Sequence, residues 1–407
     1  MSTAAFQLNI RHLRGVVAIV SRGSMSAAAQ AVNLSQPALT QGLAKLERQI
    51  GVALFDRSPN GMKPTAEGRI LAYRAEAALG HLASVMREIG VSHPRSFSRP
   101  EYLVTATQLN AYLSFAEAGS FAGAMQAIGL SKAALHRAVR DLEQLVVVPL
   151  FERRARSIAL TGAGRTVARG IRLAAGEINA GIAEIRPDRG SIGGQITVGA
   201  MPLSRAYVLP RAIAAFTRIA PYTRIDVVEG AYKELVEPLR DGIIDLIIGA
   251  LRTPHAPPDL IHAPLFSDRL AIVAHAGHPL CGVEAPTLDD LARYPWIIGR
   301  ADTPLRALWH SLFDGRDLPK APIECGSVIT IRGILRDSNF LTILSPDQVA
   351  AEIDRKVLAM IGEPLHDQVR TIGIITRALW RPTVVEQRFI EQVHLAAEAP
   401  RRYHDPI

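Results

Sequence analysis

Apolar residues near the start of the chain recur at helical spacing. Leu39, Leu43 and Leu46 follow the i, i+4, i+7 pattern of a helix that buries one face. Ser35 is a favourable N-cap for this helix, because its hydroxyl can accept a hydrogen bond from an N–H of the first turn. We therefore predict a helix over residues 35–47. Its opposite face is polar and carries Gln36, Thr40, Gln41, Ala44 and Lys45.

The flanking residues predict the elements around this helix. Upstream, the Ala-rich segment 26–32 predicts a short helix; downstream, the turn-rich basic segment 56–63 predicts a β-hairpin. A short helix, a tight turn and a polar-faced helix make a helix-turn-helix, whose second helix enters the major groove. Amide and hydroxyl side chains there read base edges, and the hairpin forms a wing along the phosphates. Taken alone, the polar-faced helix is equally compatible with an ordinary amphipathic surface helix.

The same pattern returns 96 residues later without a gap. Both copies keep the N-capping serine, the buried leucines, a glutamate after them and a threonine before the next helix. The matched pairs include Ser35 and Ser131, Leu39 and Leu135, Leu46 and Leu142, Glu47 and Glu143, Leu54 and Leu150, Arg57 and Arg153, Thr65 and Thr161, and Gly68 and Gly164. Because the spacing of every core position is kept, we predict two winged helix-turn-helix domains, over residues 6–65 and 106–161.

The polar face of the second copy has a different chemistry. Basic or ionisable side chains replace the amides and hydroxyls of the first copy, namely Lys132, His136, Arg137 and Arg140. Its wing also contains Arg153 and Arg154. This composition favours phosphate binding over base reading. The alternative is that the second copy no longer touches DNA and serves as a dimerisation or spacer domain.

Each copy is followed by an apolar stripe that predicts a long helix. The first helix, over residues 66–90, has the stripe Leu71, Ala75, Ala78 and Leu82. The second, over residues 162–187, has the stripe Val167, Ile171, Ala174, Ile178 and Ile185. The Pro- and Ser-rich segment 91–105 between them predicts a linker.

The pattern changes in the last part of the chain, over residues 192–398. Short apolar runs, which read as strands, alternate there with amphipathic helices; the runs are ITVGA, RIDVVEG, LIIGAL, LAIVA, WIIG and LTILS. Strand–helix alternation predicts an α/β fold with helices on the faces of the sheets. Such sheets bind ligands at the carboxyl ends of their strands.

Charge separates the two parts of the chain. Residues 1–190 hold 23 Lys and Arg against 13 Asp and Glu, whereas the remainder holds 23 against 25. A basic N-terminal half beside a near-neutral C-terminal half predicts a nucleic-acid-binding part joined to a part with a different role. A chain of 407 residues with 48% hydrophobic and 21% charged residues is globular and long enough for several domains.

The first repeat resembles the winged helix-turn-helix of the LysR-type transcriptional regulators. The positions that carry the resemblance form an ordered series: Ser24, Ala28, Ala29, Leu34, Ser35, Gln36, Pro37, Ala38, Leu39, Leu46, Glu47, Gly51, Leu54, Phe55, Arg57, Thr65 and Gly68. One such domain is the family's norm, so the duplication is a departure. In this family the helix after the wing pairs with its twin in another subunit, so the resemblance implies a homodimer or homotetramer.

The C-terminal part resembles the effector-sensing domain of the same family. The carriers are GGQITVGAMPLSRAYVLPRAI, VVEGAYKELVEPLRDGIIDLIIGAL, GHPL, YPWIIG and DTPLR. The stretches MPLSRA, EGAY, IGALR and TPLR look closest to the branch that includes the galactose-binding-protein regulator. The implied fold is two all-α winged helix-turn-helix domains followed by a two-lobed α/β domain like the type 2 periplasmic solute-binding proteins.

The resemblance and the local chemistry together give the candidate site residues. For double-stranded DNA they are Ser35, Gln36, Pro37, Thr40, Gln41, Lys45, Arg57, Lys63, Lys132, His136, Arg137, Arg140, Arg153 and Arg154. For a small-molecule effector they are Met201, Ser204, Arg205, Tyr232, Arg252, Thr303 and Ser327. Helix N-termini and hydroxyls favour a sugar, a sugar acid or an aromatic or other organic acid. Plain helix capping is the competing explanation for each serine and threonine.

No sequence feature indicates catalysis, a cofactor or a metal. The motifs G-x-S-x-G, H-E-x-x-H, the P-loop and C-x-x-C do not occur, and Cys281 and Cys325 are isolated. We predict a cytoplasmic, ligand-responsive transcription factor that is not an enzyme and lacks a signal segment or transmembrane helix. The alternatives are a solute-binding protein, an enzyme on a two-lobed fold, and a DNA-binding protein whose cleft is vestigial, a possibility to which Tyr232 points.

Overall fold

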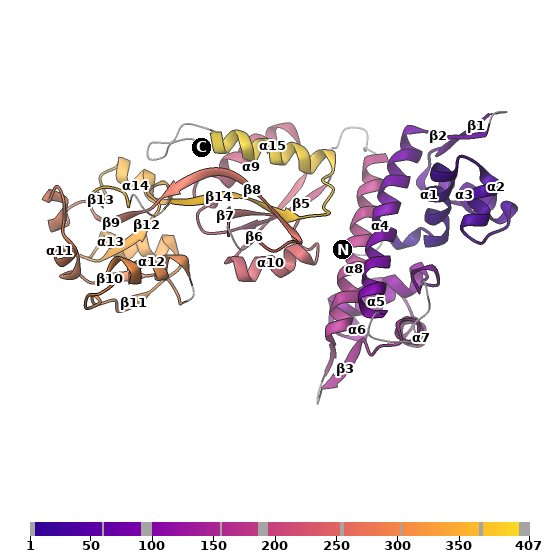
Figure 1. Cartoon of the computed structure of the whole chain (residues 1–407), viewed down its shortest axis with the longest axis horizontal. Coiled ribbons are helices and arrows are strands. Elements are labelled where there is room, and N and C mark those ends of the chain that lie inside the picture. The colour runs from indigo at the N-terminus through magenta and orange to yellow at the C-terminus, as the bar shows by residue number, and fades with distance from the viewer. Residues whose placement is uncertain are drawn as a thin grey trace. The chain divides into compact units, whose positions relative to one another are not determined.

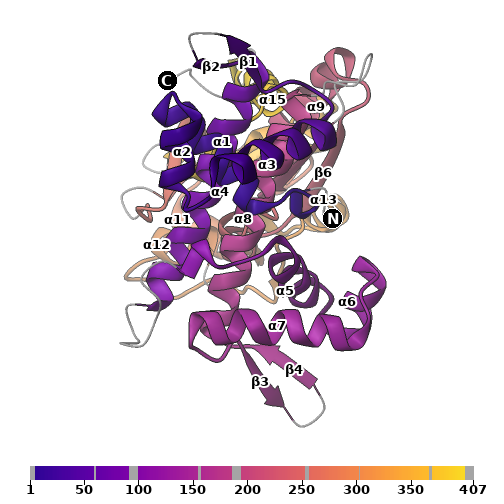
Figure 2. The same cartoon turned by 90° about the vertical axis from the view of Figure 1, so that its right-hand side faces the viewer.

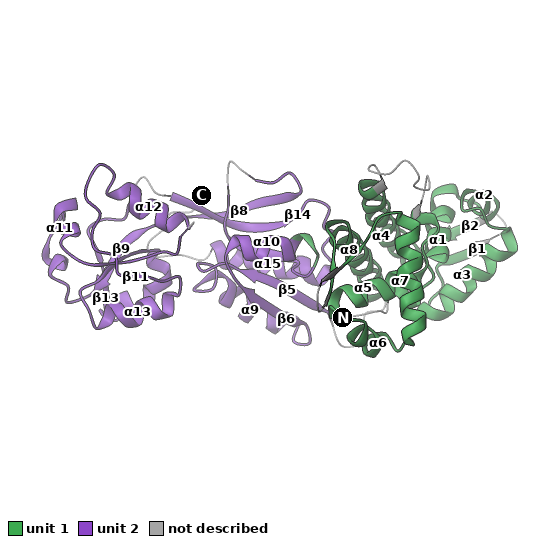
Figure 3. Ribbon diagram, turned by 90° about the horizontal axis from the view of Figure 1, so that it is seen from below, with its two compact units in different colours: residues 1–193, 240–242 green, residues 194–239, 243–407 purple. Residues whose placement is uncertain are grey.

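The structure, a computed structural model, describes residues 5–58, 61–90, 100–154, 157–185, 194–252, 256–301, 303–365 and 369–398. The chain forms two compact units, shown in Figure 3. The first unit comprises residues 1–193 with 240–242, and the second comprises residues 194–239 with 243–407. Each unit is described separately below.

The first unit contains the same order of elements twice. The first series is η1 (Ala5–Gln7), α1 (Ile10–Arg22), α2 (Met25–Ala31), α3 (Gln36–Ile50), β1 (Phe55–Ser58), β2 (Gly61–Pro64) and α4 (Ala66–Gly90). The second is η2 (Pro100–Tyr102), α5 (Ala106–Ala118), α6 (Phe121–Ile128), α7 (Lys132–Val146), β3 (Phe151–Arg154), β4 (Ser157–Leu160) and α8 (Gly162–Ile185). Each series includes a two-stranded antiparallel sheet, so the description all-α applies only to the helical parts.

The repeat extends to individual hydrogen bonds. Ser35 and Ser131 each accept a bond of 3.3 Å from the N–H three residues later, and thereby cap α3 and α7. The Glu47 carboxylate accepts the N–H of Leu54 at 2.8 Å, and the Glu143 carboxylate accepts that of Leu150 at 2.7 Å. These bonds fix the turn between the polar-faced helix and the hairpin. The residues that correspond in the sequence repeat therefore make equivalent local hydrogen bonds.

The turn that ends the polar-faced helix differs between the two copies in its backbone strain. Gly51 ends α3 with a φ of 81°, and Val147 ends α7 with a φ of 59°. Glycine adopts this left-handed conformation freely, whereas a β-branched residue is strained in it by about 1–2 kcal/mol. The second copy has thus kept the turn geometry after losing the residue that suits it.

The helices α4 and α8 lie side by side in the same chain, as Figures 1 and 2 show. Their apolar stripes form one core that also includes the helices of the first copy, with Leu71, Ala78, Leu82, Val167, Ile171 and Ile178 among its buried members. A second, smaller core lies within the second copy, around Phe115, Leu135 and Val139. The resemblance implied that each of these helices pairs with a twin in another subunit. In this structure each finds its partner within the chain, because the two stripes bury one another.

The second unit contains two five-stranded mixed sheets. The first sheet has the order β6 (Arg224–Glu229), β5 (Gln195–Ala200), β7 (Leu246–Ala250), β14 (Val369–Arg377), β8 (Leu260–Arg269). The second has the order β11 (Ile323–Glu324), β10 (Trp296–Ile298), β12 (Leu341–Leu344), β9 (Ala271–His275), β13 (Leu358–Ile361). The helices are α9 (Val208–Ile219), α10 (Tyr232–Arg240), α11 (Leu288–Ala292), α12 (Pro304–Leu312), α13 (Val328–Arg336), α14 (Ala350–Asp354) and α15 (Val384–Glu398), with η3 (Pro279–Gly282) and η4 (Pro346–Val349).

The six expected strands occur close to the predicted apolar runs, and helices alternate with them as expected, but several elements were not predicted. These are β8, β11, β13, β14 and α15. The antiparallel strands β8 and β14 pair over most of their length, and their register shifts between Ile372 and Gly373. The sequence of β8, LIHAPLFSDR, contains a proline and four polar side chains, which obscured its strand pattern. The segment 346–355 consists of the short 3-10 helix η4 followed by α14.

Candidate DNA-binding and effector-binding sites

The predicted base-reading side chains lie on the open face of α3. Gln36, Gln41 and Lys45 are exposed, whereas Leu39 and Leu43 on the opposite face are buried. Thr40 is half-buried, and its hydroxyl donates to the carbonyl of Gln36 at 2.9 Å. Ser35 and Pro37 are exposed at the N-terminal end of the helix, and Lys63 is exposed on β2. The two glutamines and the lysine are therefore available to a partner.

The corresponding face of α7 is exposed and positively charged. Lys132, Arg137 and Arg140 are exposed, and Leu135 is fully buried beneath them. His136 stacks on Phe121, with 3.8 Å between the ring centroids. Desolvation lowers the pKa of His136, and the charges of Lys132 and Arg140 lower it further. The imidazole is therefore neutral at pH 7, and the permanent charge of this face comes from the other three side chains.

Both polar-faced helices lie on the same side of the α4–α8 pair. Within the green unit, Figures 1 and 3 show α3 and α7 on the same side of these two helices. The hairpins β1–β2 and β3–β4 lie at opposite ends of the first unit in Figures 1 and 2. Arg57 and Arg153 occupy matched positions in β1 and β3, and Arg154 follows in β3. The first unit therefore has its two polar-faced helices on one side of the α4–α8 pair and a hairpin at each end.

A contact that the sequence did not reveal holds the two copies together. The Arg14 guanidinium donates to the carbonyl of Glu101 at 2.8 Å and lies 4.0 Å from the ring centroid of Tyr102. Arg14 is on α1 of the first copy, and the two other residues belong to η2, which precedes the second copy. The partners are almost ninety residues apart, so no local pattern could have indicated this contact.

Four predicted effector residues gather at one edge of the first sheet of the second unit. The strands β5, β6 and β7 are parallel, so their carboxyl ends lie together. Met201 follows β5 and packs over Gly249 of β7. Arg205 forms an ion pair with Glu229 at the end of β6. The Arg252 guanidinium lies 4.4 Å from the ring centroid of Tyr232, which is buried.

The hydroxyl residues of the predicted site are engaged in local hydrogen bonds. Ser204 is fully buried and donates to the carbonyl of Met201 at 2.9 Å. Thr303 caps α12 by accepting the N–H of Arg306 at 3.3 Å, and Ser327 caps α13 by accepting that of Thr330 at 3.4 Å. Both capping residues follow parallel strands of the second sheet, β10 and β11. Helix capping, the competing explanation, is thus a role that Thr303 and Ser327 do perform.

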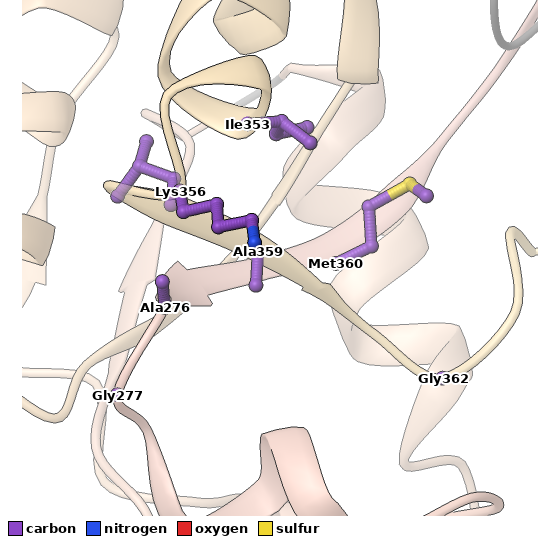
Figure 4. A pocket seen from close by; sticks show the side chains of 8 residues that line it. Ala276, Gly277, Ile353, Lys356, Ala359, Met360 and Gly362 are labelled. Atoms are coloured by element: carbon purple, nitrogen blue, oxygen red, sulfur yellow. The ribbon is translucent and has the colours of Figure 1, made fainter.

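The hollow shown in Figure 4 lies elsewhere in the second unit. It has a volume of about 690 Å³ and is bordered by the edge strand β13. Its lining residues are Ala276, Gly277, Ile353, Lys356, Leu358, Ala359, Met360 and Gly362. None of the residues predicted for effector binding is among them, so this hollow is separate from the predicted site.

Three further properties of the described residues bear on function. No helix among them is long and apolar enough to cross a membrane. No group of three His, Cys, Asp or Glu side chains in the described part of the chain is arranged to hold a metal ion. Cys281 and Cys325 are both free thiols.

Together, helix-turn-helix elements and a two-sheet α/β unit define a DNA-binding regulator with a sensing domain. The family model described as "Bacterial regulatory helix-turn-helix protein, lysR family" matches residues 10–69 and again residues 106–165. The family model "LysR substrate binding domain" matches residues 189–397. The chain belongs to the LysR family of transcriptional regulators.

Individual relatives agree with this assignment. The chain is 31% identical over 372 residues to the transcriptional regulator GalR of Pseudomonas putida, which covers 91% of this chain and 92% of that protein. It is 24% identical over 291 residues to the regulator PcaQ of Agrobacterium fabrum, covering 71% of this chain and 94% of that protein. The GalR alignment spans nearly all of both proteins, so that regulator is about as long as this chain.

Solved structures show the same fold. ArgP from Mycobacterium tuberculosis matches with a TM-score of 0.59 and 18% identity, over 72% of this chain and 97% of that one. A full-length OxyR variant from Pseudomonas aeruginosa matches with a TM-score of 0.54 and 22% identity, over 74% and 96%. As a LysR-family member, the protein is a DNA-binding regulator that responds to a small-molecule effector, and it is not an enzyme. The solute-binding and enzyme alternatives are therefore wrong.

Proposed function

We propose that this regulator carries a duplicated winged helix-turn-helix and that both copies contact DNA. The proposed domains are residues 6–65 and 106–161, the helices 66–90 and 162–187 with the linker 91–105, and an effector domain over 192–398. The single observation that carries the proposal is that α3 and α7 lie on one side of the α4–α8 pair and that each helix has an exposed polar face. Since DNA is the proposed partner, we place the protein in the cytoplasm.

The two copies have different roles in this proposal. The first copy reads bases through Gln36, Thr40, Gln41 and Lys45, while Ser35 and Pro37 set the start of the helix and Arg57 and Lys63 bind phosphates. The second copy contributes mainly electrostatic contacts. Its residues are Lys132, His136, Arg137, Arg140, Arg153 and Arg154. The support is chemical: exposed amides occur on α3, and three exposed permanent cations occur on α7.

A gel-shift series at several salt concentrations tests these roles. Gln36→Ala is expected to relax sequence preference at one position by about 1–3 kcal/mol, because an amide that reads a base edge is lost. Arg137→Ala with Arg140→Ala is expected to weaken binding to all sequences and to reduce the salt slope by about one unit per phosphate contact. Arg87→Ala, on the exposed side of α4, is the control and should change neither property. If the α7 changes altered sequence preference and Gln36→Ala had no effect, the proposed roles would be reversed.

We propose that the effector binds at the carboxyl ends of the strands in the second unit. The contributing residues are Met201, Ser204, Arg205, Tyr232, Arg252, Thr303 and Ser327. The support is that Met201 and Arg205 follow β5, Tyr232 follows β6 and Arg252 follows β7, three neighbouring parallel strands. Two guanidinium groups at such an edge suit a sugar acid or another organic acid better than a neutral ligand.

Thermal-shift measurements with sugar acids and aromatic acids test this site. A ligand that binds there raises the unfolding temperature of the native protein. Arg252→Ala is expected to weaken that ligand by about tenfold or more, since a charge-assisted hydrogen bond contributes about 1.5–3 kcal/mol. Arg293→Ala is the control, because Arg293 is exposed and pairs with Asp290 on α11. Equal weakening by both variants would mean that the ligand binds elsewhere.

A further inference from the structure

The contact between α4 and α8 is antiparallel and has two equivalent points. At the first, a β-carbon placed on Gly181 would lie 3.0 Å from the β-carbon of Arg74. At the second, a β-carbon placed on Gly170 would lie 2.9 Å from the β-carbon of Val85. The later residue of α8 meets the earlier residue of α4, so the helices run in opposite directions. All four residues are buried.

The 96-residue repeat relates these two points to each other, and it shows that they are complementary in size. The position of Arg74 in the first copy corresponds to Gly170 in the second, and that of Val85 corresponds to Gly181. A large side chain therefore always meets a glycine. A pair of two α4 helices would instead place Arg74 against Val85 at both points. A pair of two α8 helices would place Gly170 against Gly181 and leave both points unfilled.

Charge adds a second complementarity at the first point. The Arg74 guanidinium donates to the Glu177 carboxylate at 2.9 Å and also bonds to the Glu184 carboxylate. Arg74 and Glu177 are only 3% and 7% exposed. In α4 the position that matches Glu177 is His81, so two α4 helices would bury Arg74 without this carboxylate. Two α8 helices would bury both copies of Glu177 without a cation, which is strongly unfavourable.

We propose that α4 and α8 form an obligate pair within one chain, so that a single chain is the complete DNA-binding unit and reads an asymmetric two-part site. Arg74 is the positioning residue of this pair, and Gly170 and Gly181 provide the space that selects it over pairs of identical helices. The DNA part of this inference rests on the proposed function. Identical subunits read palindromes, whereas α3 and α7 differ in chemistry and so read unlike half-sites.

Two exposed glycines offer a direct test by cross-linking. Gly80 and Gly176 are matched by the repeat and lie between the two contact points, and a β-carbon on either would meet nothing within 4 Å. In the full-length chain with Cys281→Ser and Cys325→Ser, the pair Gly80→Cys and Gly176→Cys is treated with a bismaleimide on the order of 10 Å long. That length matches the separation of two packed helix axes. The two single variants, Gly80→Cys and Gly176→Cys, are treated in the same way.

The expected product of the double variant has the mass of one chain plus one linker, with no free thiol. The single variants are expected to remain single chains. A linker between chains in the double variant, or dimers from either single variant, would overturn the proposal. So would the absence of a cross-link while both thiols react with a monofunctional maleimide.

DNA binding is measured separately, so that the two proposals can fail independently. Native mass spectrometry of the cross-linked full-length protein, on a duplex that contains its binding site, counts the chains for each two-part site. One chain is expected for each pair of unlike half-sites, and two chains for each such pair would overturn the single-chain unit. An intrachain cross-link together with no DNA binding by either helix would leave the pairing intact and refute the proposed roles of α3 and α7.

Discussion

Replacement of Arg74 by alanine is expected to lower the free energy of unfolding of the first unit by about 3–5 kcal/mol. The guanidinium is almost fully buried and bonds to Glu177 and Glu184 from the neighbouring helix. Its removal leaves Glu177 as a buried carboxylate that has lost its cation. Burial by itself disfavours the charge of Arg74, but the hydrogen bonds and charges of the two glutamates outweigh this effect and raise the pKa of Arg74. The group is therefore charged at any pH used in an assay.

Differential scanning calorimetry of the full-length protein measures this loss as a fall of roughly 10 °C in the transition of the first unit. Arg87→Ala is the matched control, because Arg87 is exposed on the same helix. The double variant Arg74→Met with Glu177→Met should recover much of the stability, since it removes both buried charges and keeps most of the volume. A loss of less than about 1 kcal/mol in Arg74→Ala would mean that the ion pair does not hold the helices together.

Substitution of Gly68 by alanine is expected to destabilise the first copy by about 3 kcal/mol and to abolish its DNA binding. A β-carbon on Gly68 would lie 2.0 Å from the carbonyl oxygen of Leu54, and one on Gly164 would lie 2.1 Å from that of Leu150. Since a backbone carbonyl cannot rotate away, α4 must shift relative to the hairpin, and overpacking of this kind costs about 1–3 kcal/mol or more. Gly164→Ala is expected to have the same effect on the second copy.

Gly80→Ala is the matched control for these substitutions. Gly80 is on α4 as well, but a β-carbon there would meet nothing within 4 Å. Alanine should therefore stabilise the helix by about 0.5–1 kcal/mol through its higher helix propensity. Urea unfolding and a gel shift of the full-length variants measure both quantities. Equal stability of Gly68→Ala and Gly80→Ala would show that the close approach to Leu54 is not needed.

The local structure of the first unit could be predicted closely from the sequence. Ser35 and Ser131 indicated where α3 and α7 begin, and the leucine spacing indicated which faces are buried. These signals are readable because capping and helical periodicity depend on residues within one or two turns. The strands β8 and β14 were missed for the opposite reason. Their pairing joins segments about a hundred residues apart, and their side chains do not alternate cleanly.

The sequence by itself determined the repeat, the helix-turn-helix pattern in each copy and the family, because all three depend on the order and spacing of residues. Only the tertiary structure decided that α4 pairs with α8 in the same chain. An apolar stripe shows that a helix has a buried face but does not name its partner. The partner is selected by the fit of Arg74 against Gly181 and of Val85 against Gly170, and by the Glu177 carboxylate that meets Arg74. These contacts join residues about a hundred positions apart, so they exist only once the chain has folded.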